Sequence, residues 1–188
     1  MNRSSRIQVP LLAALVFVAA CGYNTIQTLD EKVNQAQGQI QTQLQRRSDL
    51  IPNLVNTVKG ITKQEDTVFI SIANARARLG GAVQSGNVPE MAAANQQLSQ
   101  GLGRLLAIAE NYPQLQSSQN FRQLQEQLEG TENRVAVARQ DYNTAVGEYN
   151  AFIRRFPYNL TAKVFGMGRS RAYFEAAEGA KEAPKVQF

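Results

Sequence analysis

The fold is decided by residues 121–156, FRQLQEQLEGTENRVAVARQDYNTAVGEYNAFIRRF. An apolar or aromatic residue returns at every seventh position, and a second, mostly apolar series fills the intermediate positions of each heptad. Both series fall on one side of an α-helix, which at 1.5 Å per residue would be about 54 Å long. Pro157 would end this helix, because proline interrupts helical hydrogen bonding. The first series is Phe121, Leu128, Val135, Tyr142, Tyr149 and Phe156, and the second is Leu124, Thr131, Ala138, Ala145 and Phe152.

Three further apolar stripes with helical spacing lie upstream, at residues 26–40, 51–79 and 91–109. We expect a break near residues 48–52, because Asp49 can cap a helix and Pro52 suits a first turn. Four amphipathic helices with short connections predict an all-α fold, an up-and-down antiparallel four-helix bundle with long helices. The alternative is a three-helix bundle whose first helix runs from Ile26 to Leu79 and is kinked at Pro52.

Glycine and proline mark the other predicted helix ends. Gly80–Gly81 would end the second helix, followed by a loop to Asn87. Pro89 would open the third helix, which stops at residues 111–113 because the residue before a proline resists helical geometry. In such a bundle, turns at residues 47–52 and 111–118 would lie at the end away from the N-terminus.

The first residues have the pattern of an export signal. Met1 to Arg6 carries two arginines and no acid, and Ile7 to Ala20 is apolar but shorter than the roughly 17–25 residues of a spanning helix. Val18-Ala19-Ala20-Cys21 resembles the lipobox of bacterial lipoproteins. The resemblance implies cleavage before Cys21 and attachment of palmitate-like acyl chains to this residue. The alternative is an uncleaved short anchor with a buried cysteine.

The composition of the chain argues against several classes of function. The chain has 20 Lys and Arg against 15 Asp and Glu, and loss of Arg3 and Arg6 with a signal would lower the net charge from +5 to +3. That charge is too small to indicate nucleic acid. Histidine is absent and Cys21 is the single cysteine, so the commonest metal ligand and general base are missing. We predict a protein that is not an enzyme, with no cofactor, no metal, no nucleic acid and no small-molecule substrate.

Several blocks of the sequence resemble the LemA family. The resemblance covers nearly everything after Tyr23. It implies a helical bundle that is anchored by its N-terminus, lies outside the cytoplasmic membrane and has no established catalytic activity. Many family members look anchored by an uncleaved helix, from which this lipobox-like cysteine departs. The blocks are LQRRSDLIPNLV at 44–55, residues 57–60, GRLLA at 103–107 with Glu110, Tyr112 and Pro113, residues 120–157 around LEGTENR at 128–134, and residues 173–184.

The predicted organisation has three parts: a lipoprotein signal peptide at 1–20, a helical bundle at 21–156 and a C-terminal tail at 157–188. The tail would contain a short helix packed at the membrane-proximal end. Its candidates for contact with lipid headgroups are Arg154, Arg155 and Lys163. The alternative is a solvated basic face whose apolar residues, Leu160, Val164 and Phe165, pack on the bundle.

Two groups of polar residues are candidates for binding a protein partner. The first would lie at the end of the bundle away from the membrane, and the second surrounds Gly130 in mid-helix. Glycine inside a helix lowers helix stability by about 1 kcal/mol relative to alanine, so a packing or functional role is expected for it. We expect close approach of another helix at Gly130 rather than a binding patch. The groups are Arg46, Arg47, Asp49, Tyr112 and Asn120, and Glu129, Glu132, Asn133 and Arg134.

Other polar residues fall at core positions. Glu65, Asn95 and Thr131 predict a polar layer that sets the register of the bundle, or alternatively a small polar pocket. Tyr142-Asn143, Tyr149-Asn150 and Tyr158-Asn159 repeat a dipeptide. For the first two tyrosines we expect buried rings whose hydroxyls find a partner, with a ligand groove as the alternative.

These features predict a membrane-anchored, non-enzymatic envelope protein that acts as a scaffold or adaptor for another envelope protein. The alternative is a lipid-binding or structural envelope protein, which would show an apolar cavity or bind vesicles without acylation. We expect its body on the periplasmic side of the cell envelope. Gly22 rather than aspartate follows Cys21, which favours the outer membrane.

Overall fold

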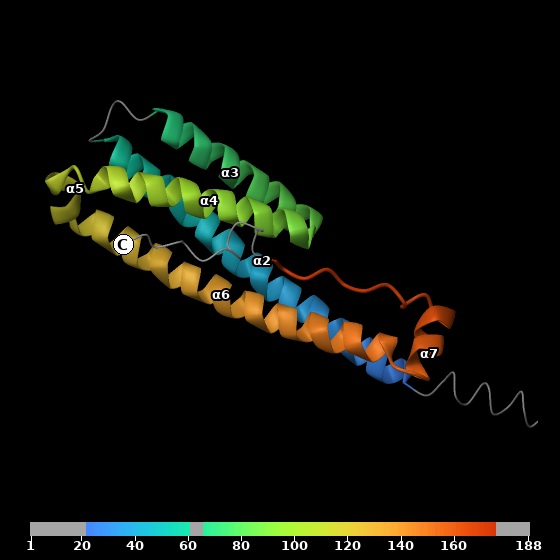
Figure 1. Ribbon diagram of the computed structural model, residues 1–188. Coiled ribbons are helices and arrows are strands. Elements are labelled where there is room, and N and C mark those ends of the chain that lie inside the picture. The colour runs from blue at the N-terminus through green and yellow to red at the C-terminus, as the bar shows by residue number, and fades with distance from the viewer. Residues whose placement is uncertain (1–21, 61–65, 176–188) are drawn as a thin grey trace, which may run out of the picture. The chain divides into compact units, whose positions relative to one another are not determined.

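Six helices make up the part of the chain that the computed structural model describes, residues 22–60 and 66–175, and no strand occurs there (Figure 1). The all-α expectation is confirmed. Cys21, the rest of the predicted signal, Glu65 and residues 176–188 lie outside the described residues. The helices are α2 (Tyr23–Lys59), α3 (Asp66–Ser85), α4 (Val88–Ala109), α5 (Pro113–Ser117), α6 (Gln119–Arg154) and α7 (Tyr158–Val164).

The described chain divides into two compact units. The smaller unit holds residues 22–36 and 141–172, and the larger unit holds residues 37–140 and 173–175. α2 and α6 each contribute residues to both units.

In the larger unit, α3 and α4 run antiparallel, as Figure 1 shows. Asn87 caps α4 by accepting a hydrogen bond from the backbone N–H of Glu90 at 3.3 Å, and Pro89 lies in the first turn. The helix predicted from Pro89 is therefore confirmed. Gly101 lets the two helices approach, because a Cβ there would lie 2.9 Å from Ile72 Cγ1.

The expected break at residues 48–52 is wrong, since α2 continues through Pro52 to Lys59. Proline has no N–H, so the carbonyl of Ser48, four residues earlier, lacks its helical donor. Arg76 of α3 supplies a substitute, because its Nε donates to the Ser48 carbonyl oxygen at 3.0 Å. No turn lies at residues 47–52, and the alternative first helix to Leu79 is also wrong, because α2 ends before α3 begins.

The expected helix end at Gly80–Gly81 is also wrong. α3 continues to Ser85, and the turn lies at Gly86–Asn87. The apolar stripe explains the continuation, because Leu79 and Ala82 on either side of the two glycines are 0% and 1% exposed. Burial of that stripe outweighs the low helix propensity of glycine.

Buried apolar side chains from α2, α3, α4 and α6 form the core of the larger unit. They include Leu44, Leu54, Ile72, Leu79, Met91, Leu98, Leu105, Phe121, Leu128 and Val135. The seven-residue series of α6 is buried as predicted except at its last member. Phe156 is 78% exposed, because α6 ends at Arg154 and the residue falls in the following turn.

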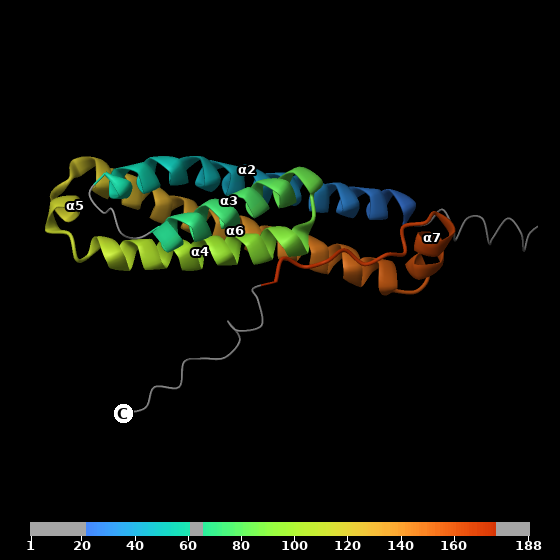
Figure 2. The same cartoon turned by 90° about the horizontal axis from the view of Figure 1, so that it is seen from above.

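In the smaller unit, α7 lies beside the first turn of α2, as Figures 1 and 2 both show. Gly22 comes directly before α2 and has a φ of +96°, and a Cβ there would overlap the Tyr158 ring. Only glycine fits this contact without strain. The rings of Tyr23 and Phe165 lie 4.7 Å apart in the same region. The contact with Tyr158 therefore explains the glycine at position 22, in addition to its predicted role in sorting the protein to the outer membrane.

Candidate functional site

A groove between α2 and α6 in the larger unit collects several of the predicted contact residues. It has a volume of about 490 Å³. Arg46 and Leu50 of α2 form one side, and α6 forms the other. We call it the Gly130 groove, and its residues on α6 are Gln123, Glu126, Gln127, Gly130, Thr131 and Arg134.

The lining of the Gly130 groove is suited to polar binding. Arg46, Glu126 and Arg134 are exposed and charged. Guanidinium groups pair with carboxylates in a planar, two-pronged geometry. The amides of Gln123 and Gln127 can both donate and accept hydrogen bonds. The groove can therefore hold an acidic and hydrogen-bonding segment of another molecule.

Gly130 does not bring two helices together, and that expectation is wrong. Among the described residues, nothing lies within 4 Å of a Cβ added at this position. Close helix approach occurs instead at Gly101. Gly130 lines the groove, so the missing side chain leaves open space there rather than a packed contact. Its cost in helix propensity, about 1 kcal/mol, is not offset by packing in the described structure.

Arg47, which we expected on a contact surface, points into the larger unit instead. Its side chain is 3% exposed and pairs with Glu132 of α6. Its Nη1 donates to Asn95 Oδ1 at 2.7 Å, and its Nη2 donates to Ser99 Oγ at 3.1 Å. Burial lowers the pKa of the Arg47 guanidinium, and the Glu132 carboxylate opposes this shift. Arg47 therefore joins α2, α4 and α6 and is not available to a partner.

The polar layer predicted from the sequence is built differently from the expectation. Asn95 accepts from Arg47, a partner that the stripe pattern did not reveal. Thr131 is buried, and its hydroxyl donates to the Leu128 carbonyl of its own helix at 2.7 Å. The two residues therefore have separate partners.

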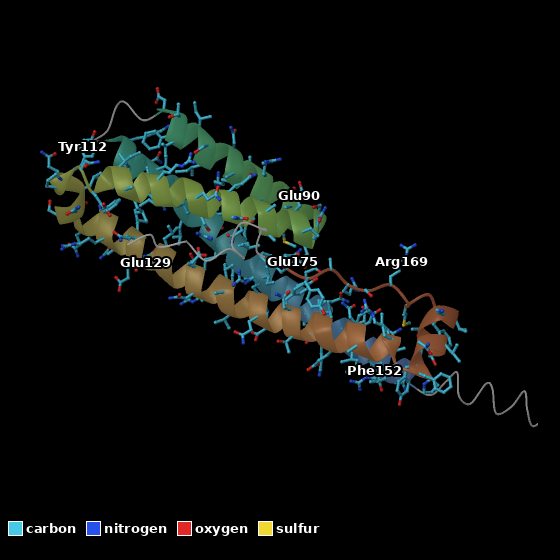
Figure 3. The ribbon with its side chains drawn as sticks, viewed as in Figure 1. Glu90, Tyr112, Glu129, Phe152, Arg169 and Glu175 are labelled. Carbon is cyan, nitrogen blue, oxygen red and sulfur yellow. The ribbon has the colours of Figure 1, made fainter. Side chains whose placement is uncertain are left out.

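The remaining candidate contact residues lie at several places on the larger unit. Asp49 accepts from Gln45 Nε2 at 2.8 Å and lines a second, more open hollow that shares Arg46 and Leu50 with the Gly130 groove. Figure 3 shows Tyr112 at the junction of α4 and α5 and Glu129 farther along α6. The structure thus brings Arg46 and Arg134 together in one groove and leaves Tyr112 outside its lining. The exposed candidates are Arg46, Asp49, Asn120, Glu129, Glu132, Asn133 and Arg134.

Sequence reasoning missed four residues of the groove. Leu50 is an ordinary apolar residue of α2, and nothing in its type marked it as a binding residue. The other three are spaced by helical turns from Gly130, and that spacing could have identified them. They are Gln123, Glu126 and Gln127.

Residues of the first two tyrosine–asparagine dipeptides hold the segment that follows α7. Tyr149 Oη donates to the Met167 carbonyl at 2.9 Å, and Tyr142 Oη donates to the Ala172 carbonyl at 2.9 Å. Both rings are buried, so the expected core role with a hydroxyl partner is confirmed. Asn150 bonds both backbone groups of Arg171, accepting from its N–H at 2.8 Å and donating to its carbonyl at 2.9 Å.

Arg171 completes this attachment with its side chain. Its Nη2 lies 2.7 Å from Asp30 Oδ1 on α2. Burial raises the pKa of Tyr142, and Arg171 lowers it in part. Burial and the Asp30 carboxylate raise the pKa of Tyr149, again against Arg171. Within the smaller unit, α2 and α6 therefore hold the segment that follows α7 through these hydrogen bonds and this ion pair.

The predicted headgroup residues belong to the smaller unit. Arg154 Nη2 bonds Ser170 Oγ at 3.0 Å, and Arg155 and Lys163 are exposed. The apolar residues among them are exposed as well, with Leu160 at 49% and Val164 at 72%. Phe165 packs against Tyr23 of α2, so the alternative in which the apolar residues pack on the bundle holds for Phe165 but not for the exposed Val164.

Metal binding and membrane crossing are two further functions on which the described residues bear. Within residues 22–60 and 66–175, no group of three His, Cys, Asp or Glu side chains is placed to hold a metal ion. None of the described helices combines the length and apolar character needed to cross a membrane.

Known proteins are similar to this chain over most of its length. The sequence model of the LemA family matches residues 36–188. The chain is 27% identical to Magnetosome protein MamQ 2 of Paramagnetospirillum magneticum, over 91% of this chain and 72% of that protein. It is 26% identical to Magnetosome protein MamQ of Magnetospirillum gryphiswaldense, over 92% of this chain and 72% of that protein.

Proposed function

Because this chain belongs to the LemA family, we propose that it is a membrane-tethered, non-enzymatic scaffold of the bacterial cell envelope. It presents the Gly130 groove to another envelope protein. The relatives are named as magnetosome proteins, which supports a membrane-associated role.

The open space at Gly130 is the observation that carries this proposal. A glycine in the middle of a long helix lowers helix stability, and here no described neighbour makes use of its small size. A partner that enters the groove would use it, because a side chain on Gly130 would occupy the volume that the partner fills. Arg46 and Arg134 on the walls favour an acidic residue on that partner.

We propose further that Cys21 carries the tether and that the body lies on the periplasmic side. The lipobox-like Val18–Cys21 and the short apolar run before it support acylation over a membrane-spanning helix. The larger unit would be the up-and-down four-helix bundle, formed by α3, α4 and the parts of α2 and α6 that belong to it.

Site-specific photocrosslinking in cells tests the groove. A photoreactive residue at Gln127, which lines the groove, should give one discrete adduct with an envelope protein. The matched control is Val137 on α6, which is 60% exposed and outside the groove lining. Gly130→Leu should abolish the Gln127 adduct, because the leucine fills the groove, and helicity by circular dichroism should be retained. Equal adducts at both positions, or an adduct that survives Gly130→Leu, would contradict the proposal.

A further inference from the structure

The short helix α7 and the turn before it expose an apolar surface in the smaller unit. Phe156, Leu160 and Val164 are spaced by four residues and are 78%, 49% and 72% exposed. Residues four apart share one side of a helix, so Leu160 and Val164 form a stripe on α7. Phe165, at 49% exposed, extends the surface beyond the end of α7. We call these four residues the α7 surface.

Basic residues lie before, within and after α7 in the sequence, with no acid among them. From Glu148 to Glu175 the sequence holds five Lys and Arg residues and no acid between those two glutamates. Arg171 is paired with Asp30. The other four make no ion pair with the described residues, and Figure 3 shows Arg169 pointing away from the ribbon. They are Arg154, Arg155, Lys163 and Arg169.

The other acids of the smaller unit belong to α2 and α6. Glu148 lies 3.8 Å from Lys32 Nζ, and both side chains are about half exposed. Glu31 and Asp141 lie on α2 and α6. The charged residues next to α7 in the sequence are therefore basic, and the acids of the unit lie on α2 and α6.

The α7 surface lies where the chain leaves its predicted anchor. Gly22 is in contact with the Tyr158 ring of α7, and Tyr23 packs against Phe165. Only Cys21 separates Gly22 from the apolar run of residues 7–20. The proposed acyl chains on Cys21 would therefore attach one residue before Gly22, which contacts α7.

We propose that the α7 surface docks on an anionic lipid bilayer. The four apolar side chains enter the boundary between headgroups and acyl chains, while Arg155 and Lys163 bind lipid phosphates. A helix as short as α7 gives only weak binding alone, but a second signal beside an acyl chain makes attachment stable. The apolar and basic character of the surface, together with the nearby anchor, favours lipid over a protein partner.

A tryptophan probe can test this in the full chain, which has no tryptophan of its own. We would place Leu160→Trp or the control Val137→Trp in the acylated protein and reconstitute each in phosphatidylcholine vesicles containing phosphatidylglycerol. Val137 is 60% exposed, but the neighbours on its side of α6, Arg134 and Asp141, are charged. Both variants carry the same tether, so a difference between them reports on α7 alone.

The expected result is a blue-shifted emission for the Leu160 probe that brominated lipids quench, and neither effect for the Val137 probe. Arg155→Gln combined with Lys163→Gln should reduce the quenching, and so should omission of phosphatidylglycerol. A Leu160 probe that stays water-exposed would overturn the proposal. A blue shift without quenching by brominated lipid would also overturn it, because the surface would then be covered by protein.

Discussion

At the scale of single residues, the hydrogen bond from Arg76 to the Ser48 carbonyl explains how α2 passes through Pro52. Ser48 is 5% exposed, so without Arg76 its carbonyl would be buried and unpaired. We expect Arg76→Ala to lower the free energy of unfolding by about 1–3 kcal/mol. In a Pro52→Ala background the restored N–H can bond the same carbonyl, so the loss should be much smaller. Urea denaturation of wild type, the two single variants and the double variant measures this double-mutant cycle.

A matched arginine provides the control for this cycle. Arg78 lies on the same helix and bonds Gln97 Oε1 at 3.0 Å in an exposed setting. Arg78→Ala should change stability by about 0.5 kcal/mol or less in either background. If Arg76→Ala lowers the free energy of unfolding equally with and without Pro52, the hydrogen bond to the Ser48 carbonyl is not the source of the stabilisation by Arg76.

The pair of Arg47 and Glu132 leads to a second prediction at this scale. Glu132→Gln removes the counter-charge of a guanidinium whose side chain is 3% exposed. Breaking a fully buried pair costs about 3–5 kcal/mol. Because the Glu132 side chain is 48% exposed, we expect a smaller loss, about 1–2 kcal/mol by thermal or urea unfolding. Glu129→Gln, three residues away and exposed, should leave stability unchanged; an equal loss there would argue against the pair.

At the scale of elements, the tyrosines of α6 should make the protein sensitive to alkaline pH. Their pKa values are raised by burial above the ordinary 10.0, so the folded state keeps its phenolic protons longer than the unfolded chain. Stability from this source is complete below pH 10 and falls as pH rises through the folded pKa. We expect Tyr142→Phe with Tyr149→Phe to flatten the loss of stability above pH 10. An unchanged alkaline slope in equilibrium unfolding would contradict this.

How well each element could be predicted depends on where its stabilising partners lie. α6 was predicted almost to the residue because its heptads are local information. The ends of α2 and α3 were not, because Pro52 and Gly80–Gly81 are breakers whose effect is cancelled by tertiary contacts. Arg76 supplies the missing donor for α2, and the buried stripe carries α3 through the two glycines.

The candidate site was predictable only in part for the same reason. Gly130 stood out as a glycine in mid-helix, Arg46 and Arg134 were predicted in two separate contact groups, and the structure places all three in one groove. The inward direction of Arg47 depends on Asn95 and Glu132, which lie on other helices. A charged residue beside an apolar stripe does not reveal from sequence alone whether it faces solvent or a distant partner.

At the scale of the whole molecule, each unit carries a surface of different chemistry. The larger unit has the polar Gly130 groove, and the smaller unit has the apolar and basic α7 surface. A scaffold that is held at a membrane needs both a place of attachment and a place for its partner. Because the two surfaces consist of different residues in different units, each should be removable without the other. Gly130→Leu should leave membrane attachment intact, and changes on α7 should leave the Gln127 crosslink intact.

Attachment itself should depend on acyl chains and α7 together. We expect wild type to incorporate labelled palmitate and to stay with membranes at any salt concentration. A chain exported by a general signal, with Cys21→Ser, should bind at low salt and be released at 1 M, where the screening length falls from about 10 Å at 0.1 M to about 3 Å. Adding Leu160→Asp and Val164→Asp should release that chain at low salt too, because the apolar contact is lost. Fractionation against salt measures all three; an unlabelled wild type that still begins at Met1 would contradict the tether.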